Sequence, residues 1–264
     1  MGFQGTPCWY ELGTPDPEAA AKFYSRLLGW QISDSGMTGI DYRLARSGED
    51  TVAGLMPLAE RPDSPPQWLI YFAAEDCDRS AAALTQAGGQ ILQAPADIPG
   101  TGRFAVVRDP QGARFGLLQP DMSNMSESDR AKAEAGRGAF SAGASGHAQW
   151  NELMSADPEA AFRFYTGLFG WTRGEAMPMG EAGDYQLFRH EGRDIGAMMG
   201  LDEAPASVWL PYFGSDLPIT KAIEVIRAEG GQVHHGPMEV PGPAFIAVAQ
   251  DPQGAWFALI GKDK

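Results

Sequence analysis

The feature that most constrains the fold is an internal repeat. Residues 9–30, WYELGTPDPEAAAKFYSRLLGW, return at 150–171 as WNELMSADPEAAFRFYTGLFGW, with 13 of 22 positions identical. Later segments return in the same order: DYRL at 41–44 as DYQL at 184–187, WLIYF at 68–72 as WLPYF at 209–213, and DPQGARF at 109–115 as DPQGAWF at 251–257. The offset stays between 141 and 143 residues. A period of this length predicts two whole domains of one fold rather than a solenoid.

The two copies are separated by a stretch rich in Ser, Gly and Ala that has no periodic apolar positions. Such a composition is typical of a linker, in which we expect at most a short helix at 127–135. The predicted organisation is therefore a first domain at 5–120, a linker at 121–146 and a second domain at 147–262. A length of 264 residues agrees with two domains.

Each copy carries the same order of predicted elements. In the first copy, Asp16, Pro17 and Glu18 begin a helix, because Asp caps exposed N–H groups and Pro suits the first turn. Apolar residues with helical spacing follow up to Gly29, and a second helix is expected at 78–87. Strands are expected at 9–13, 30–33, 41–46, 51–57, 68–74, 90–93, 102–107 and 113–118. Each copy is thus predicted as two βαβββ modules, an α+β fold with a mostly antiparallel sheet.

Composition excludes several classes of protein. The 20 Lys and Arg against 34 Asp and Glu give a net charge of −14, which disfavours nucleic-acid binding. The longest apolar run, 68–74, is too short to span a bilayer, and the first residues lack the pattern of a secretory signal. Cys8 and Cys77 are too few for a disulfide framework, and no neighbour in sequence would activate either thiol. A cytoplasmic protein with no nucleic-acid or membrane partner is therefore expected.

The motifs resemble one known superfamily. A strand followed by an Asp-capped helix with Phe-Tyr and Gly-Trp, and a DPQG turn before the last strand, are similar to the vicinal oxygen chelate superfamily in both copies. Glyoxalase I, extradiol dioxygenases and the bleomycin- and fosfomycin-resistance proteins belong to it. The resemblance implies two tandem glyoxalase-like domains, each with paired βαβββ modules in a curved sheet. Helices would cover the convex face, and the concave face, the cup, would hold the ligand.

The resemblance also implies where a metal would bind. Metal enzymes of the superfamily place His or Gln on the first strand of each module and Glu on the last. The matching positions here are Trp9, Leu69, Gly116, Trp150, Leu210 and Ala258. Because a divalent ion needs several His or carboxylate donors, we expect the usual metal site to be lost. No cofactor is predicted, and a divalent metal remains the family's alternative.

Other side chains of the cups can still do chemistry. Strand alternation places Trp9 with Glu11 on one face, and Trp150 with Glu152 on the matching face of the second copy. A partly buried carboxylate beside an aromatic wall suits general acid/base catalysis, so Glu11 and Glu152 are the candidate catalytic residues. The candidate ligand-binding residues are Trp9, Trp150, Tyr42, Tyr185, Tyr71, Tyr212 and Arg103. The alternative is a structural role, with the glutamates as hydrogen-bond anchors and the tryptophans as core.

The histidines do not repeat between the copies. His234 and His235 are adjacent on a predicted strand, so their side chains point to opposite faces and cannot bind one ion together. His147 and His190 have no duplicated partner, and all four are expected at the surface. No histidine is therefore a candidate ligand.

The leading functional hypothesis is a glyoxalase- or bleomycin-resistance-like protein that binds a small, partly hydrophobic molecule in aromatic-lined cups. The rival is a glyoxalase-like lyase or isomerase that uses a glutamate base or a divalent metal. A third possibility is that one domain is inactive and stabilises the other. Because the duplication supplies the paired modules within one chain, the protein is expected to be a monomer or a homodimer.

Overall fold

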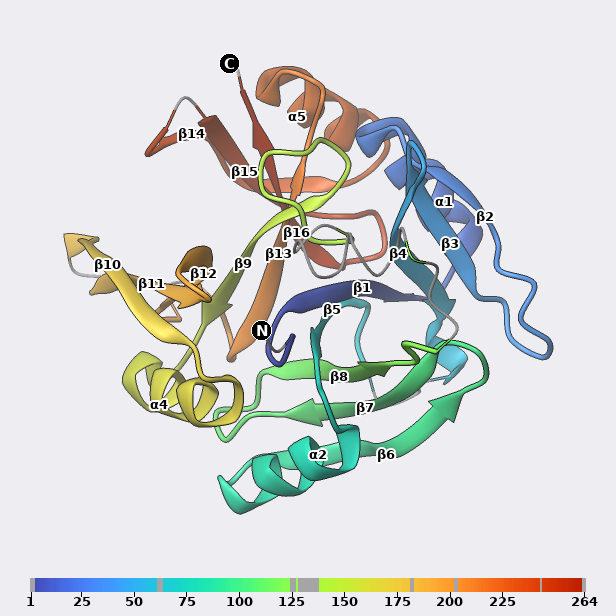
Figure 1. Ribbon diagram of the computed structural model, residues 1–264. Helices are drawn as coiled ribbons and strands as arrows, with labels where there is room; N and C mark the ends of the chain where they lie inside the picture. Colours follow the sequence, from blue (N-terminus) through green and yellow to red (C-terminus); the bar gives the residue numbers. More distant parts are fainter. Residues whose placement is uncertain are drawn as a thin grey trace. The chain divides into compact units, whose positions relative to one another are not determined.

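The computed structural model describes residues 3–60, 64–123, 127, 138–180, 183–201, 204–242 and 244–262. The repeat appears as two sets of elements, coloured blue to green and yellow to red in Figure 1. The first set is β1 (Pro7–Thr14), α1 (Pro17–Leu28), β2 (Gln31–Asp34), β3 (Arg43–Ser47), β4 (Asp50–Pro57), β5 (Gln67–Ala73), α2 (Cys77–Gln86), β6 (Gln90–Ile98), β7 (Gly102–Arg108) and β8 (Arg114–Pro120). A short 3-10 turn, Leu58–Glu60, follows β4.

The second set follows the same order. It consists of β9 (Ala148–Met154), α4 (Pro158–Phe169), β10 (Thr172–Pro178), β11 (Asp184–His190), β12 (Arg193–Met199), β13 (Val208–Gly214), α5 (Ile219–Ala228), β14 (Gln232–Val240), β15 (Ala244–Gln250) and β16 (Trp256–Gly261). The paired βαβββ modules predicted from the sequence are therefore present in both halves.

Each half of the sequence forms one eight-stranded mixed sheet. The strand orders are β2-β3-β4-β1-β5-β8-β7-β6 and β10-β11-β12-β9-β13-β16-β15-β14. Within each module the first and last strands pair in parallel, as β1 does with β4 and β5 with β8. The remaining pairs within the modules are antiparallel, as in β2–β3 and β7–β8. The predicted α+β class with mostly antiparallel sheet is confirmed.

Two details of the predicted elements need correction or stay open. β6 was expected to end at residue 93, but it continues to Ile98 through Pro95, with two register shifts against β7. The expectation was wrong because β6 lies at the edge of its sheet, where a proline that cannot donate a ladder hydrogen bond is tolerated. The helix expected at 127–135 lies, apart from Glu127, outside the described residues.

The two copies begin and end their first helices in the same way. Asp16 caps α1, with its Oδ1 accepting from the backbone N–H groups of Glu18 and Ala19 at 3.0 Å each. Asp157 caps α4 through the N–H of Ala160 at 2.9 Å. Both helices end at a glycine in the left-handed conformation, which L residues with a side chain adopt at a cost. The repeated DPEAA…G sequence thus fixes both helix boundaries, as predicted.

Packing groups the chain into two compact units that do not follow the two halves of the sequence. Unit 1 comprises the described residues within 1–8, 70–137 and 151–209, and unit 2 those within 9–69, 138–150 and 210–264. In unit 1, α2 packs on β6, β7 and β8, while α4 packs on β12 and contacts α2. In unit 2, α5 packs on β14, β15 and β16, while α1 packs on β4 and contacts α5. Each unit therefore takes one helix and the strands beneath it from each half.

An aromatic cluster with a polar centre forms the core of unit 2. Tyr24 of α1 lies fully buried among Trp30, Trp68 and Phe257. Its hydroxyl donates to Asp251 Oδ2 at 3.0 Å and accepts from Trp68 Nε1 at 2.9 Å. The other carboxylate oxygen, Oδ1, accepts from the backbone N–H groups of the DPQG turn that Asp251 begins. The polar atoms of this core thus satisfy one another.

Unit 1 contains the same arrangement with the halves exchanged. Tyr165 of α4 donates to Asp109 Oδ2 at 3.0 Å and accepts from Trp209 Nε1 at 2.9 Å. Trp171 stacks on Tyr165, with ring centroids 5.5 Å apart. Asp109 Oδ1 accepts from backbone N–H groups of its own DPQG turn, including that of Ala113. Each tyrosine therefore meets the DPQG aspartate of the other half of the sequence.

Replacing Tyr24 with phenylalanine removes one hydrogen bond from each of two buried partners. Because unsatisfied buried groups are costly, we expect Tyr24→Phe to lower the free energy of unfolding by about 1–3 kcal/mol. Denaturant unfolding followed by far-UV circular dichroism measures this change. Tyr165→Phe, the equivalent change in unit 1, should lose a similar amount. If neither substitution changed the free energy of unfolding, the two hydroxyls would not stabilise the core as described.

The buried aspartates also make stability depend on pH. Burial raises the pKa of Asp251 above its usual 3.8, so the folded state holds this proton more tightly than the unfolded chain. Its contribution to stability is fully present below about pH 3.8 and is lost as the pH rises through the raised pKa. The stability of the unmodified protein relative to Asp251→Asn should therefore fall with rising pH in urea titrations. A difference that stays constant from about pH 4 to about pH 7 would contradict this linkage.

Candidate functional site

Glu11 lies on the face of β1 that points away from the helices. Tyr10 and Leu12, its neighbours along the strand, are fully buried, and the ring of Tyr10 packs against Phe213 in the core of unit 2. The alternation of a strand therefore puts Trp9 and Glu11 on the opposite face. Glu11 is nevertheless only 6% exposed and lies in parallel register with Gly54 of β4. A carboxylate buried to this extent needs hydrogen-bond donors.

Tyr42, just before β3, supplies such a donor. Its hydroxyl donates to Glu11 Oε2 at 2.9 Å and accepts from Trp9 Nε1 at 3.0 Å. Gly54 leaves the space for this hydroxyl, since a Cβ at that position would lie 2.0 Å from the Tyr42 oxygen. The structure thus brings together Trp9, Tyr42 and Glu11, which the sequence analysis named separately. The sequence analysis did not name Gly54, which lies in the segment VAGLM at 52–56, similar to IGAMM at 195–199.

The second copy repeats the carboxylate–phenol pair. Glu152 on β9 is 6% exposed and lies in register with Ala197 of β12. The hydroxyl of Tyr185 on β11 donates to Glu152 Oε2 at 2.9 Å. Trp150, which corresponds to Trp9, is half-buried. Both glutamates named from the sequence therefore accept a hydrogen bond from a tyrosine that the sequence analysis named as a separate candidate.

Tyr71 and Tyr212 are buried more deeply, at 3% and 4% exposure. Tyr71 of β5 lies in parallel register with Gly116 of β8, and a Cβ at Gly116 would lie 2.0 Å from Cδ1 of the Tyr71 ring. Tyr212 of β13 is in the same register with Ala258 of β16. In the first copy, the space beside the position of the family's carboxylate ligand is thus filled by a phenol ring.

Arg103 is held by two carboxylates. Its guanidinium donates to Asp78 of α2 at 2.6 and 3.0 Å and to Asp97 of β6 at 2.8 Å. These bonds tie β7 to the helix and to the edge strand. Whether Arg103 also contacts a ligand stays a prediction.

The residues do not fit the metal that the family implies. Trp9, Leu69, Gly116, Trp150, Leu210 and Ala258 offer no metal-donor atom, and both leucines are buried. Among the described residues, no three His, Cys, Asp or Glu side chains lie close enough together to hold a metal ion. Glu11 and Glu152 each sit with a tyrosine and not with the several donors that a divalent ion needs.

One histidine, His147, and the two cysteines are buried or half-buried. The expectation of a surface His147 was wrong: it is 7% exposed, because Gly138 O lies 2.7 Å from its Nδ1 and Asp50 lies 3.8 Å from its Nε2. Burial raises the pKa of Cys8 to about 12 and that of Cys77 to about 11. These raised pKa values disfavour the nucleophilic thiolate form of both residues at neutral pH.

Comparison with known proteins identifies the family. Residues 8–117 and 145–259 each match the Glyoxalase family, described as the Glyoxalase/Bleomycin resistance protein/Dioxygenase superfamily. The chain therefore belongs to this superfamily, with one matching region in each half. No helix among the described residues is both long and apolar enough to cross a membrane.

Two curated proteins are similar along almost the whole chain. CFP32 of Mycobacterium tuberculosis, whose name assigns it provisionally to the glyoxylases, is 32% identical over 97% of this chain and 95% of its own. The anthracycline biosynthesis protein DnrV of Streptomyces peucetius is 28% identical over 97% of this chain and 93% of its own.

A solved metalloenzyme shares the fold. The Mn(II)-bound glyoxalase from Novosphingobium aromaticivorans superposes with a TM-score of 0.65 at 14% identity, covering 99% of this chain and 83% of that one. Metal-dependent enzymes thus occur among the structural neighbours. Their likeness at this identity extends to the fold alone.

The contact between Tyr71 and Gly116 can be tested by adding a methyl group. We expect Gly116→Ala to lower the free energy of unfolding by about 1–3 kcal/mol, because the new Cβ must displace a buried ring. Gly167→Ala, in helix α4 with no atom within 4 Å of the new Cβ, is the matched control. It should raise stability by up to about 1 kcal/mol through helix propensity. Equal effects of the two substitutions in denaturant unfolding would mean that the ring does not fill this space.

Proposed function

We propose that this protein binds a small, partly hydrophobic organic molecule at the strand faces that carry Glu11 and Glu152, without the family's usual metal. The observation that carries the proposal is the repeated pair of a nearly buried glutamate and a tyrosine hydroxyl, Glu11 with Tyr42 and Glu152 with Tyr185.

A buried carboxylate is costly unless its oxygens are hydrogen-bonded. Tyr42 meets part of this requirement, and Trp9 fixes the phenol in turn. A site of this kind presents a carboxyl acceptor beside aromatic surface. Such a combination suits a ligand with an apolar ring system and at least one hydroxyl or amine donor.

The name of one relative agrees with this ligand chemistry. DnrV is named for anthracycline biosynthesis, and anthracyclines are hydroxylated polycyclic aromatic compounds. They combine an apolar ring system with hydroxyl donors. We therefore take hydroxylated aromatic compounds as the first ligand class to test on this chain.

An enzyme is the second candidate function. The Mn(II)-bound glyoxalase shares the fold, and the name of CFP32 assigns it provisionally to the glyoxylases. In that case Glu11 or Glu152 would act as the base that moves a proton of the substrate, with Tyr42 or Tyr185 holding the carboxylate in place. The metal of the family would supply Lewis-acid chemistry, but the donors at its usual positions are missing.

Titration with 1,8-dihydroxyanthraquinone, followed by quenching of tryptophan fluorescence, tests the binding. We expect saturable binding that Glu11→Gln and Glu152→Gln each weaken about tenfold, because each removes a charged acceptor. Glu49→Gln, at an exposed position, is the matched control and should bind as the unmodified protein does. If only one of the two substitutions weakens binding, the half of the chain that carries the other glutamate has a structural role only.

The same preparations separate binding from metal-dependent catalysis. Metal analysis after purification without chelators or nickel resin should find far less than one Zn, Mn, Fe or Ni ion per chain. A stoichiometric metal that is lost in Glu11→Gln or Glu152→Gln would overturn the metal-free proposal. The enzyme function would be favoured by two results together: the anthraquinone does not quench the tryptophan fluorescence, and the protein converts an added α-ketoaldehyde–thiol adduct into a product.

A further inference from the structure

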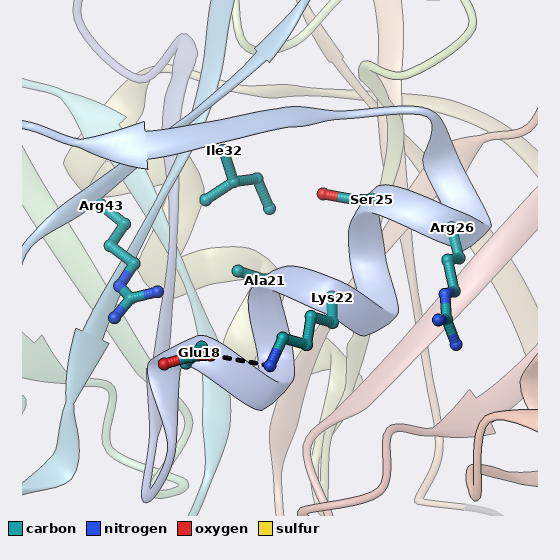
Figure 2. A pocket seen from close by; sticks show the side chains of 7 residues that line it. All are labelled: Glu18, Ala21, Lys22, Ser25, Arg26, Ile32 and Arg43. Carbon is teal, nitrogen blue, oxygen red and sulfur yellow. Dashed lines mark hydrogen bonds and ion pairs between the residues drawn. The ribbon is translucent and has the colours of Figure 1, made fainter.

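A second candidate site lies on the helix side of unit 2. Helix α1 and strands β2 and β3 line a shallow, open groove of about 480 Å³. Figure 2 shows Glu18, Lys22 and Arg26 on the helix, with Ile32 and Arg43 on the strands beside it. Neither Glu11 nor Tyr42 lines the groove, so it is separate from the site described above.

The groove combines positive charge with an apolar floor. Three cations, Lys22, Arg26 and Arg43, and one carboxylate, Glu18, line the groove. The carboxylates of Asp41 and Glu229, which pair with Arg43 and Arg26, lie outside its lining. Ala21 and Ile32, both half-buried, supply the apolar surface between these charges. A pocket with these linings favours an anion that also has an apolar part.

Each of the three cations is paired, and each pair has at least one exposed member. Lys22 binds Glu18 at 2.7 Å, Arg43 binds Asp41 at 3.0 Å, and Arg26 binds Glu229. The Lys22–Glu18 pair is exposed on both sides, and such pairs contribute little to stability, so a ligand can displace it at small cost. A guanidinium has five N–H donors, so that Arg43 can bind Asp41 and a further anion at the same time.

The second copy fills the equivalent position with its own side chains. Phe162 and Arg173 stand where the first copy has Ala21 and Ile32. The Arg173 guanidinium carbon lies 4.2 Å from the centre of the Phe162 ring, and its nitrogens donate to Glu159 and Gln186. Gln186 corresponds to Arg43. The duplication has therefore kept the scaffold but moved the cation: the first copy has Arg43 beside Ala21 and Ile32, and the second has Arg173 packed on Phe162.

We propose that the groove between α1, β2 and β3 is a binding site for a small organic anion with an apolar body. The anionic group would lie against Arg43 and Lys22, and the apolar part over Ala21 and Ile32. This inference is independent of the ligand proposed for the Glu11 and Glu152 sites.

The test uses 8-anilinonaphthalene-1-sulfonate and its uncharged relative N-phenyl-1-naphthylamine as fluorescent probes on the full chain. Arg43→Gln, which copies the residue of the second half, should weaken binding of the sulfonate about tenfold and leave the uncharged probe unaffected. Ala21→Phe combined with Ile32→Arg, which copies the filled position, should abolish sulfonate binding. Circular dichroism and urea unfolding show whether this double variant is folded.

The second half provides the matched control. Phe162→Ala with Arg173→Ile should open a groove there without creating sulfonate affinity equal to that of the first, because Gln186 replaces Arg43. Glu49→Gln, at an exposed position outside both sites, should leave sulfonate binding unchanged. Full binding in the folded Ala21→Phe, Ile32→Arg variant or in Arg43→Gln would place the probe elsewhere and overturn the proposal.

Discussion

The structure depends on a buried hydrogen bond between a tyrosine and an aspartate, made once in each unit. Asp251 uses one carboxylate oxygen to shape its own DPQG turn and the other to accept from Tyr24. Tyr24 in turn accepts from Trp68, so that a carboxylate, a phenol and an indole share one aromatic core. The same chain runs from Trp209 through Tyr165 to Asp109. Polar groups that satisfy one another specify the packing of this core more narrowly than apolar contacts would.

This constraint explains why the same short motifs recur in both halves. The FY pair of each first helix supplies the donor, and DPQG supplies the acceptor, so the two motifs are complementary parts of one interaction. These contacts hold the core together on one face of the strands. On the opposite face, each copy has a glutamate that accepts a hydrogen bond from a tyrosine hydroxyl. On the helix side the copies differ, with an open cationic groove in one and an arginine over a phenylalanine in the other.

Much of the fold could be predicted because its signals are local. Asp16 and Gly29 mark the ends of a helix by their own backbone preferences, and strand alternation placed Glu11 and Trp9 on one face. The errors arose where distant contacts decide. β6 runs through Pro95 because it lies at an edge, and His147 is buried because Gly138 and Asp50 reach it through the folded chain. The need for glycine at positions 54 and 116 could not be predicted, because it arises from Tyr42 and Tyr71, whose side chains occupy the space that a Cβ would take.

The sequence by itself determined the duplication and the βαβββ order, since both follow from residue types and their spacing. Its motifs also carried the resemblance to the superfamily that the family match shows. Only the tertiary structure decided which tyrosine meets which aspartate. Each half contains one of each, and the repeat gives no reason for Tyr24 to bind Asp251 rather than Asp109. The choice depends on α1 packing with α5 and α4 with α2, which joins the halves through long-range contacts that local sequence does not encode.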